Sequence, residues 1–236
     1  MSSPQKPVLW IFGGPNGSGK SFVTNSIYMS NPDIPQKYIN ADVIAKERNI
    51  SSLEAANIAL AQREAALAAR GSFAMETVMS MPDKIDLMRR AKSLGYEVML
   101  VYVSTQDPDI NLGRVKRRRQ AGGHDVPPEK VLSRYDRSMR FLPEALAVAD
   151  KADIYNNSFD NPVLIAEKTH KNGLIIYEQS PPSKWTRESI MALIGVADEK
   201  EQRICKGEST GETGQQQRYY EPEDREWEHS DDRDDR

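Results

Sequence analysis

The sequence predicts an α/β fold in which helices cover both faces of a mostly parallel β-sheet. Short apolar runs, typical of buried strands, alternate along residues 8–180 with segments whose apolar residues recur at helical spacing. A glycine-rich loop separates the first apolar run from the first helical segment. Because strands that alternate with helices form right-handed βαβ units, they assemble into a parallel sheet with helices packed on each side.

The first half of the chain shows this alternation with clear punctuation. Ser51 is a typical helix N-cap and Gly71 a typical helix stop, so a long alanine-rich helix is expected between them. Pro82 and Gly95 frame the next helix in the same way. Strands are expected at residues 8–12, 37–40 and 72–77, and helices at residues 20–30, 51–70 and 82–94.

The second half continues the pattern through a strongly basic segment. The apolar run at residues 97–103 is the clearest strand of the chain. A basic helix is expected after it, then a glycine-containing loop, then a helix that Pro143 should interrupt or kink. The expected ranges are 108–120 for the basic helix, 121–128 for the loop, about 128 for the start of the last helix, and 152–155 and 173–177 for two short strands.

Charge divides the chain into two parts. Residues 201–236 hold 12 acidic and 6 basic residues, whereas residues 1–200 are mildly basic. Apolar periodicity stops after about Val196, and a polar, charged segment of this kind is typical of disorder. We therefore expect one domain at residues 1–200 and an acidic, disordered tail at residues 201–236. A mildly basic domain suits anionic ligands but does not demand nucleic acid.

Cysteine content and hydropathy bear on the cellular compartment. Cys205 is the single cysteine, which excludes an intramolecular disulfide and fits a reducing environment. The five apolar residues at 8–12 are too few for a signal peptide, and no stretch approaches the about 18 apolar residues of a membrane span. The expected location is cytoplasmic, without a membrane partner.

Residues 14–21 match the GxxxxGK[ST] pattern of a phosphate-binding loop, or P-loop, and lie between a strand and a helix as that loop requires. Its glycines let backbone N–H groups approach phosphates closely, and the helix N-terminus adds partial positive charge. Lys20 should reach the β- and γ-phosphates of ATP, and the Ser21 hydroxyl should bind the Mg²⁺ that accompanies the nucleotide. The expected nucleotide-binding residues are Gly14, Pro15, Asn16, Gly17, Ser18, Gly19, Lys20 and Ser21.

The P-loop alone does not identify a reaction, because kinases, GTPases and several classes of ATPase share it. The Asn-Lys-x-Asp segment with which GTPases bind the base is absent. The clearest strand has no carboxylate at its end before Asp107, unlike the strand that carries the acidic residue of a Walker B ATPase. These observations favour a small-molecule kinase with the three-layer P-loop fold.

Two carboxylates follow strands at the edge where ligands bind in an open α/β sheet. Asp42 comes directly after the second strand and could orient or deprotonate an attacking hydroxyl, although it could also cap the helix that follows. Glu76 ends the third strand and could bind a substrate hydroxyl, with Thr77 beside it, or could be a solvated strand end. We expect Asp42 to be catalytic, and Glu76 and Thr77 to bind substrate.

Residues 114–119 include five basic side chains in six positions. A solvated helix face or an RNA-binding patch is one interpretation. A catalytic lid at about residues 108–140 is the favoured one, because Gly122 and Gly123 form a plausible hinge and lid arginines stabilise a transferring phosphoryl group. Helical spacing places Arg114, Arg117 and Arg118 on one face, and Arg114 and Arg118 are the preferred candidates.

With these segments in place, the chain resembles the zeta-toxin family of P-loop kinases, in the Gram-negative branch often described as predicted ATPases. The resemblance covers roughly residues 8–180. The matching segments are residues 13–21, 40–44, 73–77, and 114–138, the last of which contains Gly-Gly-His-Asp-Val-Pro at 122–127.

The resemblance implies transfer of the ATP γ-phosphoryl group to a hydroxyl of an activated sugar, UDP-N-acetylglucosamine in well-known members. It implies that Lys20 and Ser21 hold the phosphates and Mg²⁺, that Asp42 is the base and that Glu76 binds substrate. Arg114 matches the first of two lid arginines. At the second position either His124 or another lid arginine takes over. The family also implies toxicity and a separate antitoxin protein.

Overall fold

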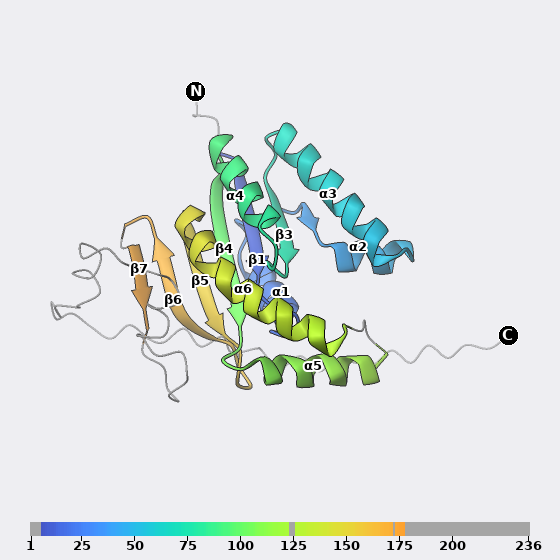
Figure 1. Ribbon diagram of the computed structural model, residues 1–236. Coiled ribbons are helices and arrows are strands. Elements are labelled where there is room, and N and C mark those ends of the chain that lie inside the picture. The colour runs from blue at the N-terminus through green and yellow to red at the C-terminus, as the bar shows by residue number, and fades with distance from the viewer. Residues whose placement is uncertain (1–5, 123–125, 172, 178–236) are drawn as a thin grey trace, which may run out of the picture.

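The computed structural model describes residues 6–122, 126–171 and 173–177 of the 236-residue chain. The elements alternate as expected and form one seven-stranded sheet with helices on both faces (Figure 1). The expected acidic tail at residues 201–236 lies outside the described residues. Within the described part of the chain, no helix is both long enough and apolar enough to cross a membrane.

The sheet has the order β2-β3-β1-β4-β5-β6-β7, and the first five of these strands run parallel. The predicted mostly parallel sheet is therefore confirmed. The last two strands pair antiparallel, and the first of them, β6, was not expected from the sequence. The strands are β1 (Val8–Gly13), β2 (Tyr38–Ile39), β3 (Phe73–Thr77), β4 (Glu97–Ser104), β5 (Lys151–Asn156), β6 (Val163–Thr169) and β7 (Gly173–Ile176).

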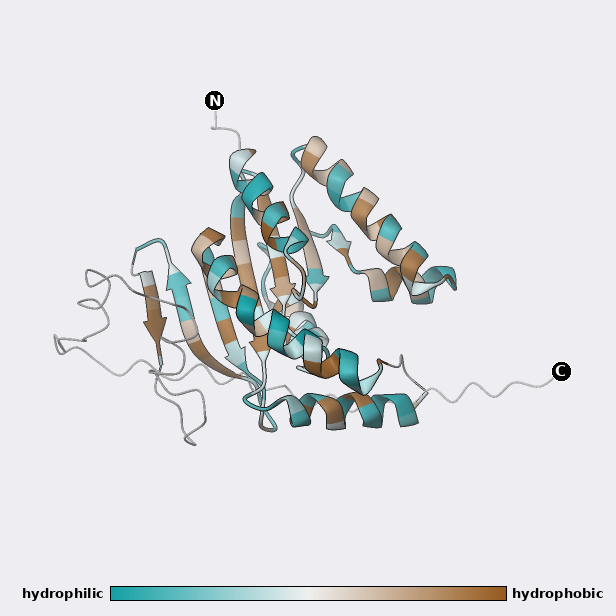
Figure 2. Cartoon of the chain, viewed as in Figure 1, coloured by the Kyte–Doolittle hydropathy of each residue, from teal (hydrophilic) through white to brown (hydrophobic). Residues whose placement is uncertain are grey.

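Alternation along β1 separates two apolar cores on opposite faces of the sheet. Leu9 and Ile11 belong to the larger core, to which four helices contribute, and Trp10 and Phe12 belong to the smaller core beneath α1. Figure 2 shows apolar colour in the central strands and alternating apolar and polar residues along the helices. The helices are α1 (Lys20–Ser30), α2 (Ala41–Arg48), α3 (Ser52–Ala68), α4 (Asp83–Ser93), α5 (Pro108–Gln120) and α6 (Pro128–Val148).

The N-terminus of α3 is capped as the sequence predicts, whereas its C-terminus differs from the prediction. Ser51 forms a complete capping box with Glu54, as a serine N-cap predicts. At the C-terminus the left-handed residue is Arg70, with φ of 50°, rather than the expected Gly71. Pro143 does not end α6, which continues through it to Val148. A proline inside a helix removes one backbone hydrogen bond, and the packed apolar face of α6 compensates for this loss.

The two helices of the expected lid make a small core of their own. Val115 of α5 packs with Val126 and Val131, and Leu112 adds to this cluster, which is separate from the two sheet cores. The far half of α6 instead packs in the larger sheet core through residues such as Leu142 and Leu146. The helix α6 therefore joins the lid cluster to the body of the domain.

Candidate functional site

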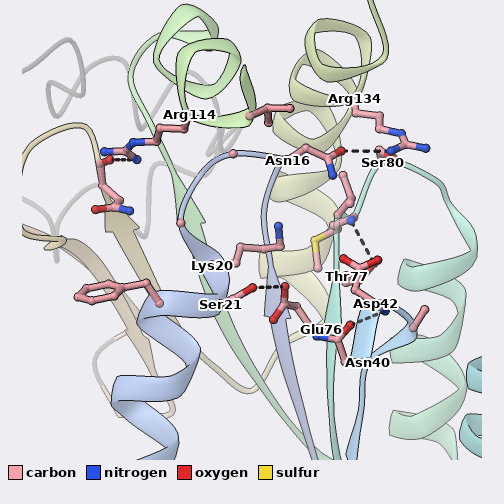
Figure 3. A pocket seen from close by; sticks show the side chains of 18 of the residues that line it. Asn16, Lys20, Ser21, Asn40, Asp42, Glu76, Thr77, Ser80, Arg114 and Arg134 are labelled. Carbon is pink, nitrogen blue, oxygen red and sulfur yellow. Dashed lines mark hydrogen bonds between the residues drawn. The ribbon is translucent and has the colours of Figure 1, made fainter. Parts of the chain in front are cut away.

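A pocket of about 870 Å³ lies at the carboxyl edge of the parallel strands. The ends of β1, β2, β3 and β5 all contribute to its wall, because parallel strands end on the same side of the sheet. Helices α3 and α4 line one part of the wall and the lid helices α5 and α6 another. Figure 3 shows labelled side chains around this space that come from the P-loop and α1, from the ends of β2 and β3 with the segments that follow them, and from the lid helices α5 and α6.

The loop between β1 and α1 follows the P-loop pattern and depends on glycine for steric reasons. Gly14 has φ of 140°, and a Cβ added there would lie 2.0 Å from the carbonyl oxygen of Val103. Gly19 has φ of 83°, and its Cβ would lie 2.1 Å from Nδ2 of Asn157. Residues with a side chain rarely adopt these backbone angles, and a Cβ at either position would overlap the neighbouring atom. The loop is therefore packed against the ends of β4 and β5 as well as being open to the pocket.

Lys20 lies at the start of α1 and lines the pocket although only 8% of its surface is exposed. Its ammonium group donates a hydrogen bond to the carbonyl of Pro15, at 3.1 Å. Burial lowers the pKa of Lys20, while the nearby carboxylates of Glu76 and Asp42 oppose this shift and Arg118 adds to it. The side chain is thus a poorly solvated cation within the field of both predicted carboxylates and of one lid arginine.

A chain of hydrogen bonds joins the P-loop to the ends of β2 and β3. The Ser21 hydroxyl donates to Oε1 of Glu76 at 3.0 Å, and the Tyr38 hydroxyl donates to Oε2 at 2.8 Å. Burial and the adjacent Glu76 carboxylate raise the pKa of Tyr38, which keeps its hydroxyl protonated. Glu76 is therefore a fixed acceptor in the pocket wall rather than a solvated strand end.

Asp42 lines the pocket from the first turn of α2. The helix cap is Asn40, whose Oδ1 accepts a hydrogen bond from the backbone N–H of Asp42 at 2.9 Å. The alternative interpretation of Asp42 as the helix cap is therefore wrong. Because Asn40 provides the cap, the carboxylate of Asp42 does not perform it, and the cap holds the backbone of Asp42 in place.

The lid contributes cationic side chains to the pocket from α5. Arg114 and Arg118 both line it, whereas Arg117 is not among the pocket-lining residues in the described part of the chain. Arg114 donates a hydrogen bond to the carbonyl of Asn157, at 2.7 Å, and burial lowers its pKa, with Arg117 adding to that shift. The structure thus separates Arg114 and Arg118 from Arg117, a choice that helical spacing left open.

Thr77 and His124 were also expected to bind substrate. Thr77 lines the pocket, but its hydroxyl oxygen accepts a hydrogen bond from the backbone N–H of Met79 at 3.1 Å. Met79 has φ of 54°, unusual for a residue with a side chain, so this contact helps hold the turn after β3. His124 lies outside the described residues.

Several polar residues at the site were missed by the sequence analysis. Asn111 donates to the carbonyl of Asn16 at 2.6 Å, and Asn157 donates to that of Ser18 at 2.8 Å, so both asparagines brace the P-loop. Arg134 of α6 donates to Oδ1 of Asn16 at 3.3 Å. The position of Asn157 just after β5 was a usable signal, because strand ends form the site, whereas nothing local distinguishes Asn111.

Sequence comparison places the chain in a family. No protein-family model matches it. A protein of Haemophilus influenzae, described as an uncharacterized protein, is 33% identical over 139 residues, which cover 54% of this chain and 96% of that protein. Because the similarity spans nearly all of the Haemophilus protein, the two chains belong to one family.

Solved structures share the fold at low sequence identity. A chain of the AvrRxo1-ORF1:-ORF2 complex, whose crystal structure contains ATP, has a TM-score of 0.58 and 16% identity, over 80% of this chain. This chain spans 64% of the length of that one. A chain of the PezAT chromosomal toxin–antitoxin system of Streptococcus pneumoniae has a TM-score of 0.50 and 16% identity, over 86% of this chain and 84% of that one.

Proposed function

We propose that this chain, a member of one family with the Haemophilus influenzae protein, is an ATP-dependent kinase that phosphorylates a hydroxyl group of a small molecule. One observation carries the proposal: the P-loop lysine Lys20 and the carboxylate of Asp42 line the same pocket, with Glu76 between their elements. A kinase needs this pairing, because one group holds the phosphoryl donor and the other accepts the proton of the attacking hydroxyl.

The P-loop half of the pocket suits the triphosphate of ATP. Lys20 is a poorly solvated cation whose hydrogen bond to Pro15 can be exchanged for one to a phosphate oxygen. The volume of about 870 Å³ lies within the range of about 300–1,000 Å³ that is usual for small-molecule sites. The crystal structure of AvrRxo1-ORF1:-ORF2 with ATP supports a nucleotide as the ligand of this fold.

Ser21 and Glu76 fit the Mg²⁺ that accompanies ATP in this class of enzyme. Their oxygens lie 3.0 Å apart in the pocket wall, and hard oxygen ligands are those that Mg²⁺ prefers. Ser21 would hold the ion directly and Glu76 through water. The ion, when bound, supplies neutralisation of the charge on the phosphate oxygens.

The remaining groups have separate roles in this proposal. Asp42 accepts the proton of the acceptor hydroxyl as that oxygen attacks the γ-phosphorus, and the bond from the γ-phosphorus to the bridging oxygen of ADP breaks. Lys20, Arg114 and Arg118 stabilise the negative charge on the transferring group and on the departing ADP. Arg114 first exchanges its hydrogen bond with the carbonyl of Asn157 for one with phosphate.

For the acceptor we propose a hydroxyl of a UDP-activated sugar similar to UDP-N-acetylglucosamine, bound by Glu76 and Thr77. The resemblance to the zeta-toxin family supports this acceptor, and the fold shared with a chain of the PezAT toxin–antitoxin system agrees with it. The same similarity supports a toxic activity and a separate antitoxin protein as partner. Nucleosides, dinucleotides and antibiotics with a free hydroxyl are the alternative acceptors.

The catalytic domain in this proposal comprises residues 1–200, with a lid at about 108–140 and an acidic tail that catalysis does not need. The separate core of Val115, Val126 and Val131 supports the lid as a unit. Deleting residues 201–236 should leave turnover unchanged within about twofold. Loss of activity would assign the tail a part in the catalytic domain.

The decisive experiment incubates the protein with ATP, Mg²⁺ and a panel of UDP-sugars and nucleosides, and uses mass spectrometry to detect one added phosphoryl group. We expect one acceptor class to be modified by the native chain and by Asp33→Asn, an exposed control, but not by Asp42→Asn. ATP hydrolysis that proceeds equally in native protein and Asp42→Asn, with no acceptor modified, would exclude the kinase.

A nucleic-acid-associated ATPase is the second candidate, because Lys116, Arg117 and Arg119 are exposed side chains of α5 outside the pocket wall. Phosphate contacts would give RNA binding that weakens steeply with salt. Binding that disappears when these three residues are neutralised, in a protein that modifies no small acceptor, would favour this function.

A further inference from the structure

Arg63 is a buried arginine of α3 that faces the pocket without a local partner for its Nε atom. Only 8% of its surface is exposed, and it belongs to the pocket wall. Its Nε makes no hydrogen bond within the described residues, and no ion pair of Arg63 occurs among them. A buried guanidinium that lacks partners is costly, so its retention needs a reason.

The two carboxylates whose charge acts on Arg63 are already paired with other cations. Asp83 and Glu64 are the two acids whose charge acts on Arg63, yet burial still lowers its pKa. Asp83 pairs with Lys84, and Glu64 accepts two hydrogen bonds from Arg90, at 2.9 and 2.6 Å. Among the described residues of this cluster, Arg63, Lys84 and Arg90 are three cations beside two carboxylates. Arg63 is the buried cation of the three.

The helix α3 presents a sparse surface to the pocket around Arg63. Ser52 and Ala56 line the pocket with it, at spacings of four and seven residues that place all three on one helix face. Ser52 and Ala56 are small, so the pocket-lining face that carries Arg63 holds few bulky side chains. Arg63 is the single basic residue of α3, and it lies on this face.

Other cations enter the pocket from the neighbouring helices. Lys84 lines it from α4, and Arg134 and Arg137 line it from α6. Lys84 is paired with Asp83, and Arg134 donates to Asn16, but the Nε of Arg63 has no acceptor within the described part of the chain. Arg63 and Lys84 line the pocket from α3 and α4, whereas the P-loop residues line it from the segment that follows β1.

We propose that Arg63 is the anchor of an oxyanion-binding subsite in the acceptor half of the pocket. The inference rests on the proposed function, since it places an anionic group of the acceptor at Arg63. That group is a phosphate, as in the diphosphate of the proposed UDP-sugar, or a carboxylate if the acceptor is of another class. An oxyanion would supply the charge and hydrogen bonds that the fold does not give to Arg63.

The test measures binding by calorimetry in a Lys20→Met background, in which the P-loop lacks its phosphate-binding cation. Pyrophosphate and malonate serve as probes, since they are a diphosphate and a dicarboxylate of similar size. Adding Arg63→Met should weaken pyrophosphate, malonate or both at least about tenfold, as loss of a charge-assisted hydrogen bond implies. The probe that loses more identifies the oxyanion class. Arg89→Met, an exposed arginine outside the pocket wall, is the matched control and should change neither affinity.

Thermal unfolding separates this role from a structural one. Arg63→Met should unfold at the same or a higher temperature than the parent without ligand, because it replaces an unpartnered buried charge with an apolar side chain of similar length. If Arg63→Met does not fold, Arg63→Lys tests the same subsite, and its probe affinity should fall several-fold because the planar fork is lost.

Probe affinities that are the same with and without Arg63, in whichever variant folds, would overturn the proposal. The readout is independent of phosphoryl transfer. A protein that phosphorylates nothing but loses pyrophosphate binding with Arg63 would keep the subsite and exclude the kinase. A protein that phosphorylates an acceptor, but binds the probes equally with and without Arg63, would keep the kinase and exclude the subsite.

Discussion

The hydroxyl of Ser21 donates a hydrogen bond of 3.0 Å to Oε1 of Glu76, and this bond joins the P-loop to the end of β3. Glu76 also accepts a hydrogen bond from the Tyr38 hydroxyl at 2.8 Å, so its carboxylate connects α1 and β2. The residues that we assign to the nucleotide and to the acceptor are therefore physically connected before any ligand binds.

Glu76→Gln should disturb this connection without a large change of shape. Ser21 and Tyr38 donate to different oxygens of the carboxylate, and the amide replaces one of these oxygens with an NH₂ group, so one of the two donors loses its acceptor. We expect stability to fall by about 1 kcal/mol and catalytic efficiency about 10- to 100-fold, from the loss of a charge-assisted bond and of the Mg²⁺-facing charge. Glu47→Gln, at an exposed site of α2, is the control for urea unfolding and kinetics.

Asp42→Asn should remove the base while leaving nucleotide binding intact. We expect turnover to fall about 10²- to 10⁴-fold, the range usual for loss of general base catalysis, with the ATP dissociation constant changed less than about threefold. The Asn40 cap binds the backbone of Asp42, not its side chain, so the fold should persist. Stopped-flow or calorimetric nucleotide binding beside steady-state kinetics checks both parts. A large loss of ATP affinity would instead place Asp42 at the nucleotide.

Gly19→Ala should destabilise the P-loop, because its Cβ would lie 2.1 Å from Asn157 Nδ2 at a φ of 83°. We expect a loss of about 1–3 kcal/mol and undetectable ATP binding at micromolar concentration. Gly113→Ala is the matched control, since nothing lies within 4 Å of the added Cβ and the site is inside α5. It should stabilise the protein by about 0.4–1 kcal/mol. Equal thermal shifts for the two variants would contradict the packing described at Gly19.

Arg114→Met and Arg118→Met should each lower turnover more than they weaken ATP binding, about 10- to 1,000-fold, because lid arginines act on charge that develops during transfer. Arg117→Met, on the same helix but outside the described pocket wall, should stay within about threefold of the native rate. Comparing the rate constants of all three variants at saturating ATP tests the assignment. A larger loss with Arg117 than with Arg118 would reverse it.

The ionised carboxylate of Asp150 should stabilise the fold only at pH values above the pKa that it has in the folded protein. Burial favours a raised pKa, but hydrogen bonds from Lys92 and from the Val98 N–H outweigh burial, so the net pKa is lowered from the ordinary value. The unfolded chain therefore binds the proton more readily than the folded chain, and stability falls as pH falls below about 4. Asp150→Asn should be less stable by about 1 kcal/mol at pH 7, and this difference should shrink in acid. Urea unfolding from pH 7 to pH 3, with exposed Asp136→Asn as control, measures it.

Local pattern was sufficient for most of the architecture. The apolar runs of β1 and β4 and the P-loop between strand and helix depend on neighbours in sequence, so periodicity and turn residues predict them well. The strand β6 was not predicted because its residues 163–169 mix apolar and charged side chains and most of them are only partly buried. Its pairing with β5 is antiparallel and is fixed by a partner outside the local sequence.

The sequence alone was enough to predict an α/β sheet with a ligand site at its carboxyl edge, and it placed Lys20, Asp42 and Glu76 at that edge. The tertiary structure decided which helical arginines reach the pocket, that Asn40 and not Asp42 is the helix cap, and that Arg63 of α3 faces the same space. The physical reason is distance along the chain. A motif is a short local arrangement. The unsatisfied Nε of Arg63 is recognised only from the folded arrangement of the described residues, in which Asp83 pairs with Lys84 and Glu64 with Arg90.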